Sequence, residues 1–458
     1  MHKHCTSSRR RLATGTSLAG LALSALAGTD QVATTVVSNQ AVAPSISAWQ
    51  LNKPAWLTEV SLSVKESYDD NILLVSGNGP LKPQSSFVTT VSPKIGFNFA
   101  PLLKKQTLFQ VLSFGYSPDF AVYHSASGES YDAHRFTDTI KGKSGPLSYS
   151  LDNALYYIDG STTAPTYEGL DRFRSGFASV VPKERRAQAQ DRTKVLFQYD
   201  GETFFVRPTA CLLYYDMMTD LSPAVGYQNY PSRYDLNGGA DLGYRVIGDF
   251  AFTLGYRYGH QYQQQLPKNI DSTQFASDND YQRILVGMEG KPWPWLTLAM
   301  QGGPDFRDYA STAAVSDRNQ VTYYAEASAT AVITSNDSLL LKYKQWRFVS
   351  YCGRLPYFDS DYELAYHRKL TDKLSFDLAG KIAEYDFTCA SDPKGSNLRN
   401  DFLYSITPSV TYAITPTFTV TASGSIDFGR NAQDNPPGGA SYREFDHNVA
   451  CLSATYKF

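Results

Sequence analysis

The sequence lacks any long apolar run beyond its first thirty residues. No eighteen consecutive apolar residues occur there, which excludes transmembrane helices. The mean hydropathy is -0.33, and charged residues make up 19% of the 458 positions. A polar average does not exclude a membrane protein built from strands, because alternating apolar and polar residues cancel in the mean.

Cysteines and catalytic motifs are also scarce. Five cysteines are too few for a disulfide scaffold of this length, and none has CxxC spacing. The sequence contains no GxSxG, HExxH or phosphate-binding GxxxxGK motif. The seven histidines show no metal-ligand spacing. We therefore expect neither an enzyme nor a metal or cofactor site.

The N-terminus resembles a targeting segment. Lys3 and Arg9–Arg11 precede the short apolar stretch Leu18–Ala27, which ends in the cleavable pattern Ala25-Leu-Ala27. A membrane anchor is the alternative, but the stretch is about half the length that spans a bilayer. Residues 1–27 are predicted to be a signal peptide and 28–56 a periplasmic lead-in.

Cleavage after Ala27 removes four of the 42 basic residues and none of the 44 acidic ones. The mature net charge is then -6, which gives no reason to expect nucleic-acid binding.

From residue 57 onward, apolar and polar residues alternate over long stretches. In 234–245, Tyr234, Leu242 and Tyr244 share one face, while Asp235 and Asp241 share the other. The stretches 321–333 and 417–430 alternate in the same way. Such runs exceed the usual five or six residues of soluble strands and suit tilted membrane strands.

The pattern predicts a transmembrane antiparallel up-and-down β-barrel over residues 57–458, with about eighteen strands and a range of 16 to 20. The predicted strands are 57–70, 86–99, 106–123, 131–143, 147–159, 185–199, 203–217, 232–246, 250–264, 280–290, 294–308, 319–334, 338–350, 358–369, 373–388, 400–413, 417–429 and 443–458.

The predicted links alternate in length, as in outer-membrane barrels. Short links include 199–202, 246–249, 335–337, 370–373 and 415–416. The long links between them include 160–184, 218–231, 265–279, 309–318, 389–399 and 430–442. An even strand number places both termini on the periplasmic side. A soluble propeller or solenoid is disfavoured because no repeat is visible.

The C-terminus adds a specific signal. Tyr456 and Phe458 share a face with Leu452, and Thr455 and Lys457 share the opposite face. A terminal Phe after alternating apolar residues resembles the signal that the outer-membrane assembly machinery recognises. We expect that machinery, outer-membrane lipid and lipopolysaccharide to be partners of the chain.

A family hint lies in the first strand. The run Glu66–Leu74, which contains Tyr68-Asp-Asp-Asn71, resembles a run near the start of outer-membrane β-barrel porins, some of which are associated with exopolysaccharide systems. The resemblance implies fold and location more than substrate. For Asp69, Asp70 and Asn71 we favour capping of backbone groups over a calcium site.

Charged residues fall on the face opposite the apolar stripe, which predicts a hydrated lumen. For most of these charges we favour the interpretation that they neutralise one another as an inner-wall ladder without a role in selectivity. The pore-lining candidates are Arg192, Lys194, Arg207, Arg233, Asp235, Asp241, Arg245, Arg257, Glu326, Lys342 and Lys344; Lys65, Lys94, Asp377, Lys381, Asp401 and Asp427 are also placed inward.

These features favour a passive or weakly selective porin for small hydrophilic solutes. The alternative is an outer-membrane component of a polysaccharide assembly or export system, and the third reading is a rim-site enzyme or adhesin. The loop 160–184 either folds inward to narrow the channel or stays outside in solvent. Cys352 and Cys389 fall on consecutive outer loops and either form a disulfide or stay free.

The targeting segment makes a direct prediction. Protein isolated from membranes should begin at or near Gly28, because signal peptidase cuts after a small-x-small pattern. N-terminal sequencing measures this. Retention of Arg9–Arg11 in the mature protein would contradict the prediction.

Overall fold

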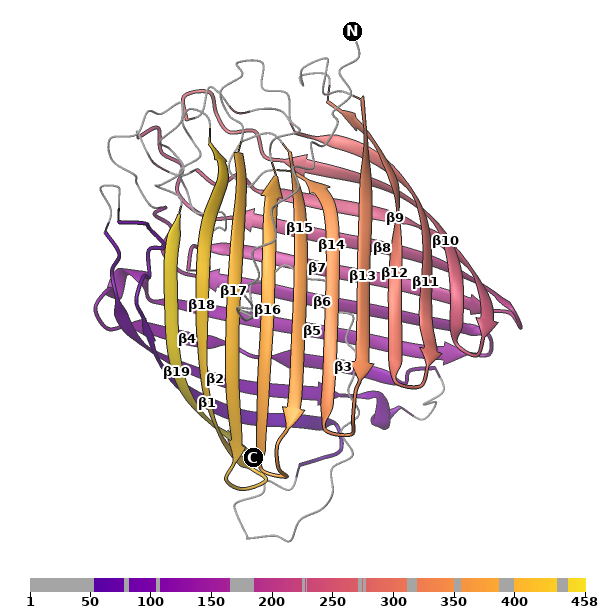
Figure 1. Ribbon diagram of the computed structural model, residues 1–458, viewed down its shortest axis with the longest axis horizontal. Helices are drawn as coiled ribbons and strands as arrows, with labels where there is room; N and C mark the ends of the chain where they lie inside the picture. Colours follow the sequence, from indigo (N-terminus) through magenta and orange to yellow (C-terminus); the bar gives the residue numbers. More distant parts are fainter. Residues whose placement is uncertain are drawn as a thin grey trace, which may run out of the picture.

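The computed structural model of the chain is a closed antiparallel β-barrel (Figure 1). No helix long and apolar enough to cross a membrane occurs in the described residues. The structure describes residues 53–77, 82–103, 108–164, 185–224, 227, 229–270, 274, 277–310, 319–349, 356–386, 399–434 and 444–458.

The strands are 5 to 17 residues long, and two single-turn 3-10 helices accompany them. They are β1 Leu57–Asp69, β2 Ser86–Asn98, η1 Ala100–Leu102, β3 Val111–Tyr116, β4 Asp119–Tyr123, η2 Ser127–Glu129, β5 Tyr131–Ser144, β6 Leu147–Asp159, β7 Gln188–Asp200, β8 Phe204–Met217, β9 Arg233–Ile247, β10 Phe250–Gln263, β11 Asn279–Trp293, β12 Leu296–Tyr309, β13 Asn319–Val332, β14 Asp337–Phe348, β15 Tyr357–Lys369, β16 Leu374–Asp386, β17 Arg399–Ala413, β18 Phe418–Asp434 and β19 Phe445–Lys457.

Apart from β3 and β4, each strand pairs with its sequence neighbours, and β1 pairs with β19 to close the sheet. The strand predicted at 106–123 is broken into β3 and β4 at Ser117-Pro118, because proline has no N–H to give to the ladder. Both halves pair with β2 and β5, so the barrel is eighteen strands around, as predicted.

The two ends of the barrel differ in the length of their links. At the turn end, 145–146, 201–203, 248–249 and 294–295 join consecutive strands. At the opposite, loop end, the links are longer, as between β6 and β7. The pairing of Ser61 with Lys457 places the start of β1 and the end of β19 at the turn end. One link there is longer than predicted, since 99–110 replaces the expected 100–105.

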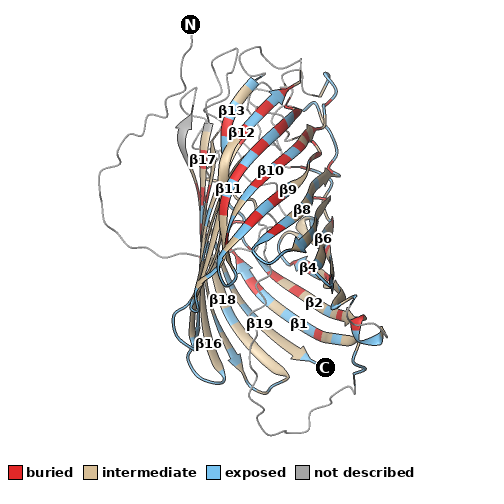
Figure 2. Cartoon of the chain, turned by 90° about the vertical axis from the view of Figure 1, so that its right-hand side faces the viewer, coloured by how far each residue is buried: buried red, intermediate tan, exposed pale blue. Residues whose placement is uncertain are grey.

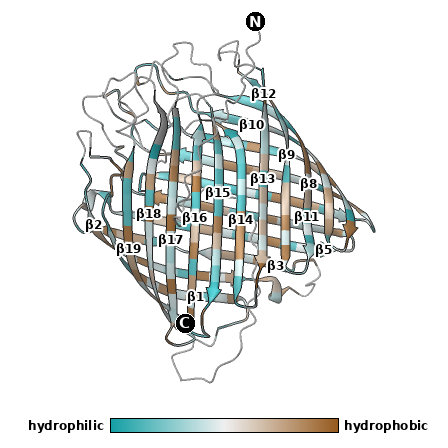
Figure 3. Ribbon diagram, viewed as in Figure 1, coloured by the Kyte–Doolittle hydropathy of each residue, from teal (hydrophilic) through white to brown (hydrophobic). Residues whose placement is uncertain are grey.

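The wall has two distinct faces, as the alternation in β9 illustrates. Asp241 is 4% exposed, whereas the next residue, Leu242, is 49% exposed. Buried and exposed residues alternate along β9 to β12 in Figure 2, and hydrophilic and hydrophobic residues alternate in Figure 3. A single-residue slip would exchange the faces, so the pattern fixes the register of this wall.

The outer face is apolar in its middle and aromatic toward both ends. Exposed aromatic residues near the turn end include Phe197, Tyr199, Phe204, Tyr244, Trp293, Trp295 and Tyr412, and those toward the loop end include Tyr68, Phe87, Tyr214, Tyr258, Tyr323 and Tyr404. Asn153, Asp191 and Thr193 depart from this pattern. They lie on the outer face of β6 and β7 and hydrogen-bond to one another.

The Tyr-Asp-Asp-Asn run forms the loop-end part of the seam between β1 and β19. Asp69 accepts from the backbone N–H of Asn71 (3.0 Å), which is the capping role expected for it. Asp70 accepts from the backbone and side-chain nitrogens of Asn448 (2.7 Å each). Asn71 donates to the carbonyls of Val75 and Asp446 (2.8 Å each).

His447 completes the seam from β19. Its Nε2 lies 3.1 Å from Asp69 of β1, and its Nδ1 lies 2.9 Å from Asp427 of β18. Carboxylate oxygens accept, so both ring nitrogens must donate for both bonds to form, and the imidazole is then positively charged. The seam is thus held by charge-assisted bonds across three strands.

The seam gives a stability prediction. Asn71→Ala should lower the free energy of unfolding by about 1–3 kcal/mol, because buried backbone carbonyls lose their donor. The measurement is the urea midpoint at which the folded, heat-modifiable band disappears. Asp372→Ala is the control, since this exposed turn residue is bound to Lys369 at the surface and should shift stability by about 0.5 kcal/mol or less. Equal shifts in both variants would contradict the seam's role.

Candidate functional site

The predicted pore-lining residues lie on the inner face of the wall. Along each strand they alternate with outward residues such as Leu242, Phe252 and Leu341, which are exposed. The inward candidates comprise Arg192 and Lys194 of β7, Arg207 of β8, Arg233, Asp235, Asp241 and Arg245 of β9, Arg257 of β10, Glu326 of β13, and Lys342 and Lys344 of β14.

Toward the turn end, four charges of this inner face form one ion-pair group. The guanidinium of Arg207 donates to both carboxylate oxygens of Glu289 (2.6 and 2.7 Å) and to Asp241 (3.1 Å). Arg257 approaches the other oxygen of Asp241 at 2.7 Å. Arg245 pairs separately with Asp200. Each inward cation here is compensated by a carboxylate.

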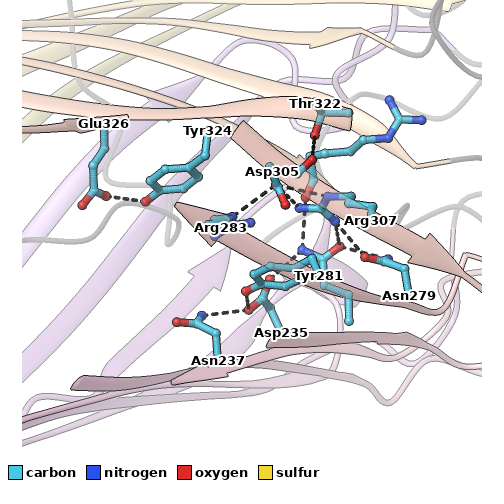
Figure 4. Close-up of polar contacts among 12 residues, drawn as sticks. Asp235, Asn237, Asn279, Tyr281, Arg283, Asp305, Arg307, Thr322, Tyr324 and Glu326 are labelled. Atoms are coloured by element: carbon cyan, nitrogen blue, oxygen red, sulfur yellow. Dashed lines mark hydrogen bonds and ion pairs between the residues drawn. The ribbon is translucent and has the colours of Figure 1, made fainter. Parts of the chain in front are cut away.

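Toward the loop end, Asp305 of β12 is at the centre of a second group (Figure 4). Arg283 of β11 and Arg307 of β12 both donate to its Oδ2, at 3.1 and 2.8 Å. The ring of Tyr281 lies under both guanidiniums, at 4.1 and 4.9 Å from ring centroid to guanidinium carbon. Tyr281 donates to Asp235 at 2.7 Å. All five side chains are buried, so their pairing is needed to offset desolvation.

A third group follows β14 to β16. Lys381 lies 2.8 Å from Asp361, and Lys342 lies 3.5 Å from Glu363. The ammonium of Lys344 is 4.0 Å from the ring centroid of Trp346. From β13 to β16 the inner wall therefore alternates acid and base between neighbouring strands, as in the neutralising ladder.

The lumen at the loop end is narrowed by an apolar cluster. Phe348 and Val349 at the end of β14 and Tyr357 at the start of β15 pack with Tyr230 and Ala164 from two loops. Residues 165–184 of the loop expected to fold inward or stay in solvent lie outside the described residues. Its first part, at Ala164, packs in the mouth of the barrel.

The return of that loop is anchored at the rim. Glu129 of η2 binds Arg185 at 2.8 Å and Arg186 at 3.0 Å. Burial alone would raise the pKa of Glu129, but the charges and hydrogen bonds of the two arginines outweigh it and lower the pKa below its ordinary value. The carboxylate therefore stays charged at neutral pH and holds residues 185–186 against the mouth.

The sequence reasoning missed three deeply buried charges of the lumen. Arg283, Asp305 and Arg307 were not among the candidates. The sequence did hold a signal that Arg283 faces inward, because it is followed by the apolar Ile284 and Val286 at outward positions, where both are exposed. Apolar Leu285 shares the inner face of β11 and obscures that alternation.

The remaining predicted sites are only partly covered. Cys352 and Cys389 lie outside the described residues, so their disulfide stays a prediction. Cys211 and Cys451 form no disulfide with each other. Within the described part of the chain, no group of three or more metal-binding side chains is present.

Comparison with known proteins gives only distant likenesses. No family model and no curated protein matches the chain. Among solved structures, the outer membrane protein OpdK of Pseudomonas aeruginosa matches at 10% identity and a TM-score of 0.42, covering 87% of this chain and 99% of that one. OccAB3 of Acinetobacter baumannii matches at 11% identity with the same TM-score and coverage. OccK9 (OpdG) of Pseudomonas aeruginosa matches at 10% identity and 0.42, covering 87% and 98%.

The Asp305 group gives a second stability prediction. Asp305→Ala should lower the free energy of unfolding by about 3–5 kcal/mol, because it leaves two buried guanidiniums without their carboxylate. Glu289→Ala is the control and should cost about 1 kcal/mol or less, since Arg207 keeps Asp241 and Glu289 is partly solvated. Urea unfolding of the folded barrel in detergent measures both. Similar losses would show that the group is not buried in the functioning barrel.

Proposed function

We propose that the chain is a porin-like channel of the outer membrane for small hydrophilic solutes. The observation that carries the proposal is the two-faced closed wall, apolar outside and charged inside. The outer face is stable against lipid, whereas the inner face needs water or paired charges. A barrel of about eighteen strands encloses a lumen that water can fill.

The outer surface supports this location. The aromatic residues near both ends match the two interfaces of a bilayer, where aromatic side chains are favoured. Trp293 and Trp295 stack at the turn end with ring centroids 5.8 Å apart. Tyr456 and Phe458 contact each other at the end of β19, where the assembly machinery would recognise them. The expected signal peptide, residues 1–27, fits the same destination.

The pairing of the inner charges favours weak selectivity. Arg207, Arg283 and Arg307 are each bound to carboxylates of the wall, so their fields are largely cancelled. The apolar cluster at the loop end restricts the lumen and favours small solutes. The same cluster argues against a conduit for long polysaccharides, the alternative suggested by the first-strand resemblance.

The proposal is tested by reconstituting the full chain into planar bilayers and liposomes. We expect discrete conductance steps with little preference between K⁺ and Cl⁻, and swelling in small sugars that falls off as sugar size grows. Passage of long oligosaccharides at the same rate would favour the polysaccharide conduit. No conductance and no swelling, with a folded heat-modifiable barrel present, would contradict a channel of any kind.

A further inference from the structure

The ladder between β13 and β14 stops well before the loop end. β13 pairs with β12 out to Asn319, but with β14 only from Ala325 onward. The last pair is Ala325 with Gln345, and β14 continues for three residues beyond it. In Figure 1, β14 turns away from β13 toward their upper ends. No other pair of neighbouring long strands in the described wall stops this early at the loop end.

The end of β14 stays paired with β15, as Phe348 with Tyr357, but leans into the barrel. By alternation, Arg347 belongs to the outward set with Leu341 and Tyr343, yet it is only 2% exposed. Its Nε donates to the hydroxyl of Tyr309, an inward residue of β12, at 3.0 Å. Its carbonyl accepts from the inward Gln261 of β10 at 3.1 Å. A strand in the wall could not contact these inner-face groups from its outward side.

From this position the end of β14 reaches the opposite wall. The ring centroids of Phe348 and Tyr215 of β8 are 6.5 Å apart, and the guanidinium of Arg233 of β9 lies 5.2 Å from the ring of Phe348. These contacts join strands that are several positions apart around the barrel. The end of β14 therefore bridges the lumen at its loop end.

The register of the β13–β14 ladder defines a second arrangement for the end of β14. If the antiparallel register of Ala325 with Gln345 continued, Tyr323 would face Arg347 and Thr322 would face Phe348. In the described residues, no ladder pair joins Thr322 or Tyr323 to β14. Unpaired backbone at a wall is costly in a membrane, which favours this closure of the ladder.

We propose that the end of β14, residues 346–348, is a gate. In the arrangement observed, it bridges the lumen while one edge stays paired with β15. When its other edge pairs with residues 322–324 of β13, it returns to the wall, carrying the start of β15 with it, and the mouth widens. Each state has its own compensation: cation–π and hydrogen-bond contacts across the lumen in the closed state, and backbone ladder bonds to β13 in the open state. A few such contacts on each side give two states of similar free energy, as a gate requires. The inference rests on the proposed channel function and names its regulation.

The experiment locks the open state with a disulfide. In a chain with Cys211, Cys352, Cys389 and Cys451 replaced by Ser, Tyr323→Cys and Arg347→Cys are combined. Directly opposed residues have Cα atoms about 4.5–5.5 Å apart, within the range for a disulfide, so the bond can form only when the strands pair. Oxidation of the membrane-embedded protein should raise the single-channel conductance several-fold, and reduction should reverse the rise.

The matched control is Ala325→Cys with Gln345→Cys, the last existing pair of the ladder. It should oxidise equally well and leave the conductance unchanged. Arg347→Cys alone reports the effect of losing the contacts to Tyr309 and should give a smaller rise that reduction does not reverse. The folded, heat-modifiable band verifies that each variant assembles.

The outcomes separate the gate from the channel. If the 325–345 pair oxidises and the 323–347 pair does not, the strands never meet and the gate is wrong. If the 323–347 disulfide forms and a conducting channel is unchanged, the gate is equally wrong. If no variant conducts in either redox state, the channel proposal fails, and the yield of the 323–347 disulfide alone then shows whether the end of β14 moves.

Discussion

Backbone hydrogen bonding is the constraint on which this structure depends. In hydrocarbon an unpaired N–H or C=O group costs several kcal/mol, roughly, so a sheet that crosses a bilayer must pair every strand on both sides. The chain meets this by joining β1 to β19 after a full circuit. Strand length, the short links at one end and the position of the termini all follow from that closure. The only early stop described here, between β13 and β14, is therefore a departure that needs compensation from the lumen.

Closure of the sheet encloses a lumen, and the lumen explains why charged residues occur on the inner face. A carboxylate or guanidinium can be kept in the middle of a membrane only where water or an opposite charge reaches it. Asp241, Asp305 and Asp361 each hold cations from their own or a neighbouring strand. Pairing across strands fixes their positions, so the inner wall is both polar and rigid. The inner wall thus presents charges of both signs and not a field of one sign.

Much of this was predictable from period-two alternation, because lipid and lumen select opposite residue types at adjacent positions. The alternation in 234–245 predicted the two faces of that strand. The residue types of Asp69 and Asn71 predicted that they cap backbone groups. What alternation cannot show is where a strand leaves the wall. Arg347 keeps its place in the outward series although its side chain lies inside. The break at Pro118 was visible in the residue type, but the pairing of both halves with the same neighbours depends on the whole sheet.

The seam has a consequence for how the barrel forms. His447 and Asp69 are 378 positions apart in the sequence, so their contact is among the most costly in chain entropy and forms after the intervening wall has curved round. Until then β1 and β19 are two free edges, each able to pair with another copy of the chain. The carboxylates of β1 and the imidazole and Asn448 of β19 are complementary in charge and hydrogen bonding, and an unrelated strand would lack these partners. They bias the last step toward closure within one molecule and away from aggregation.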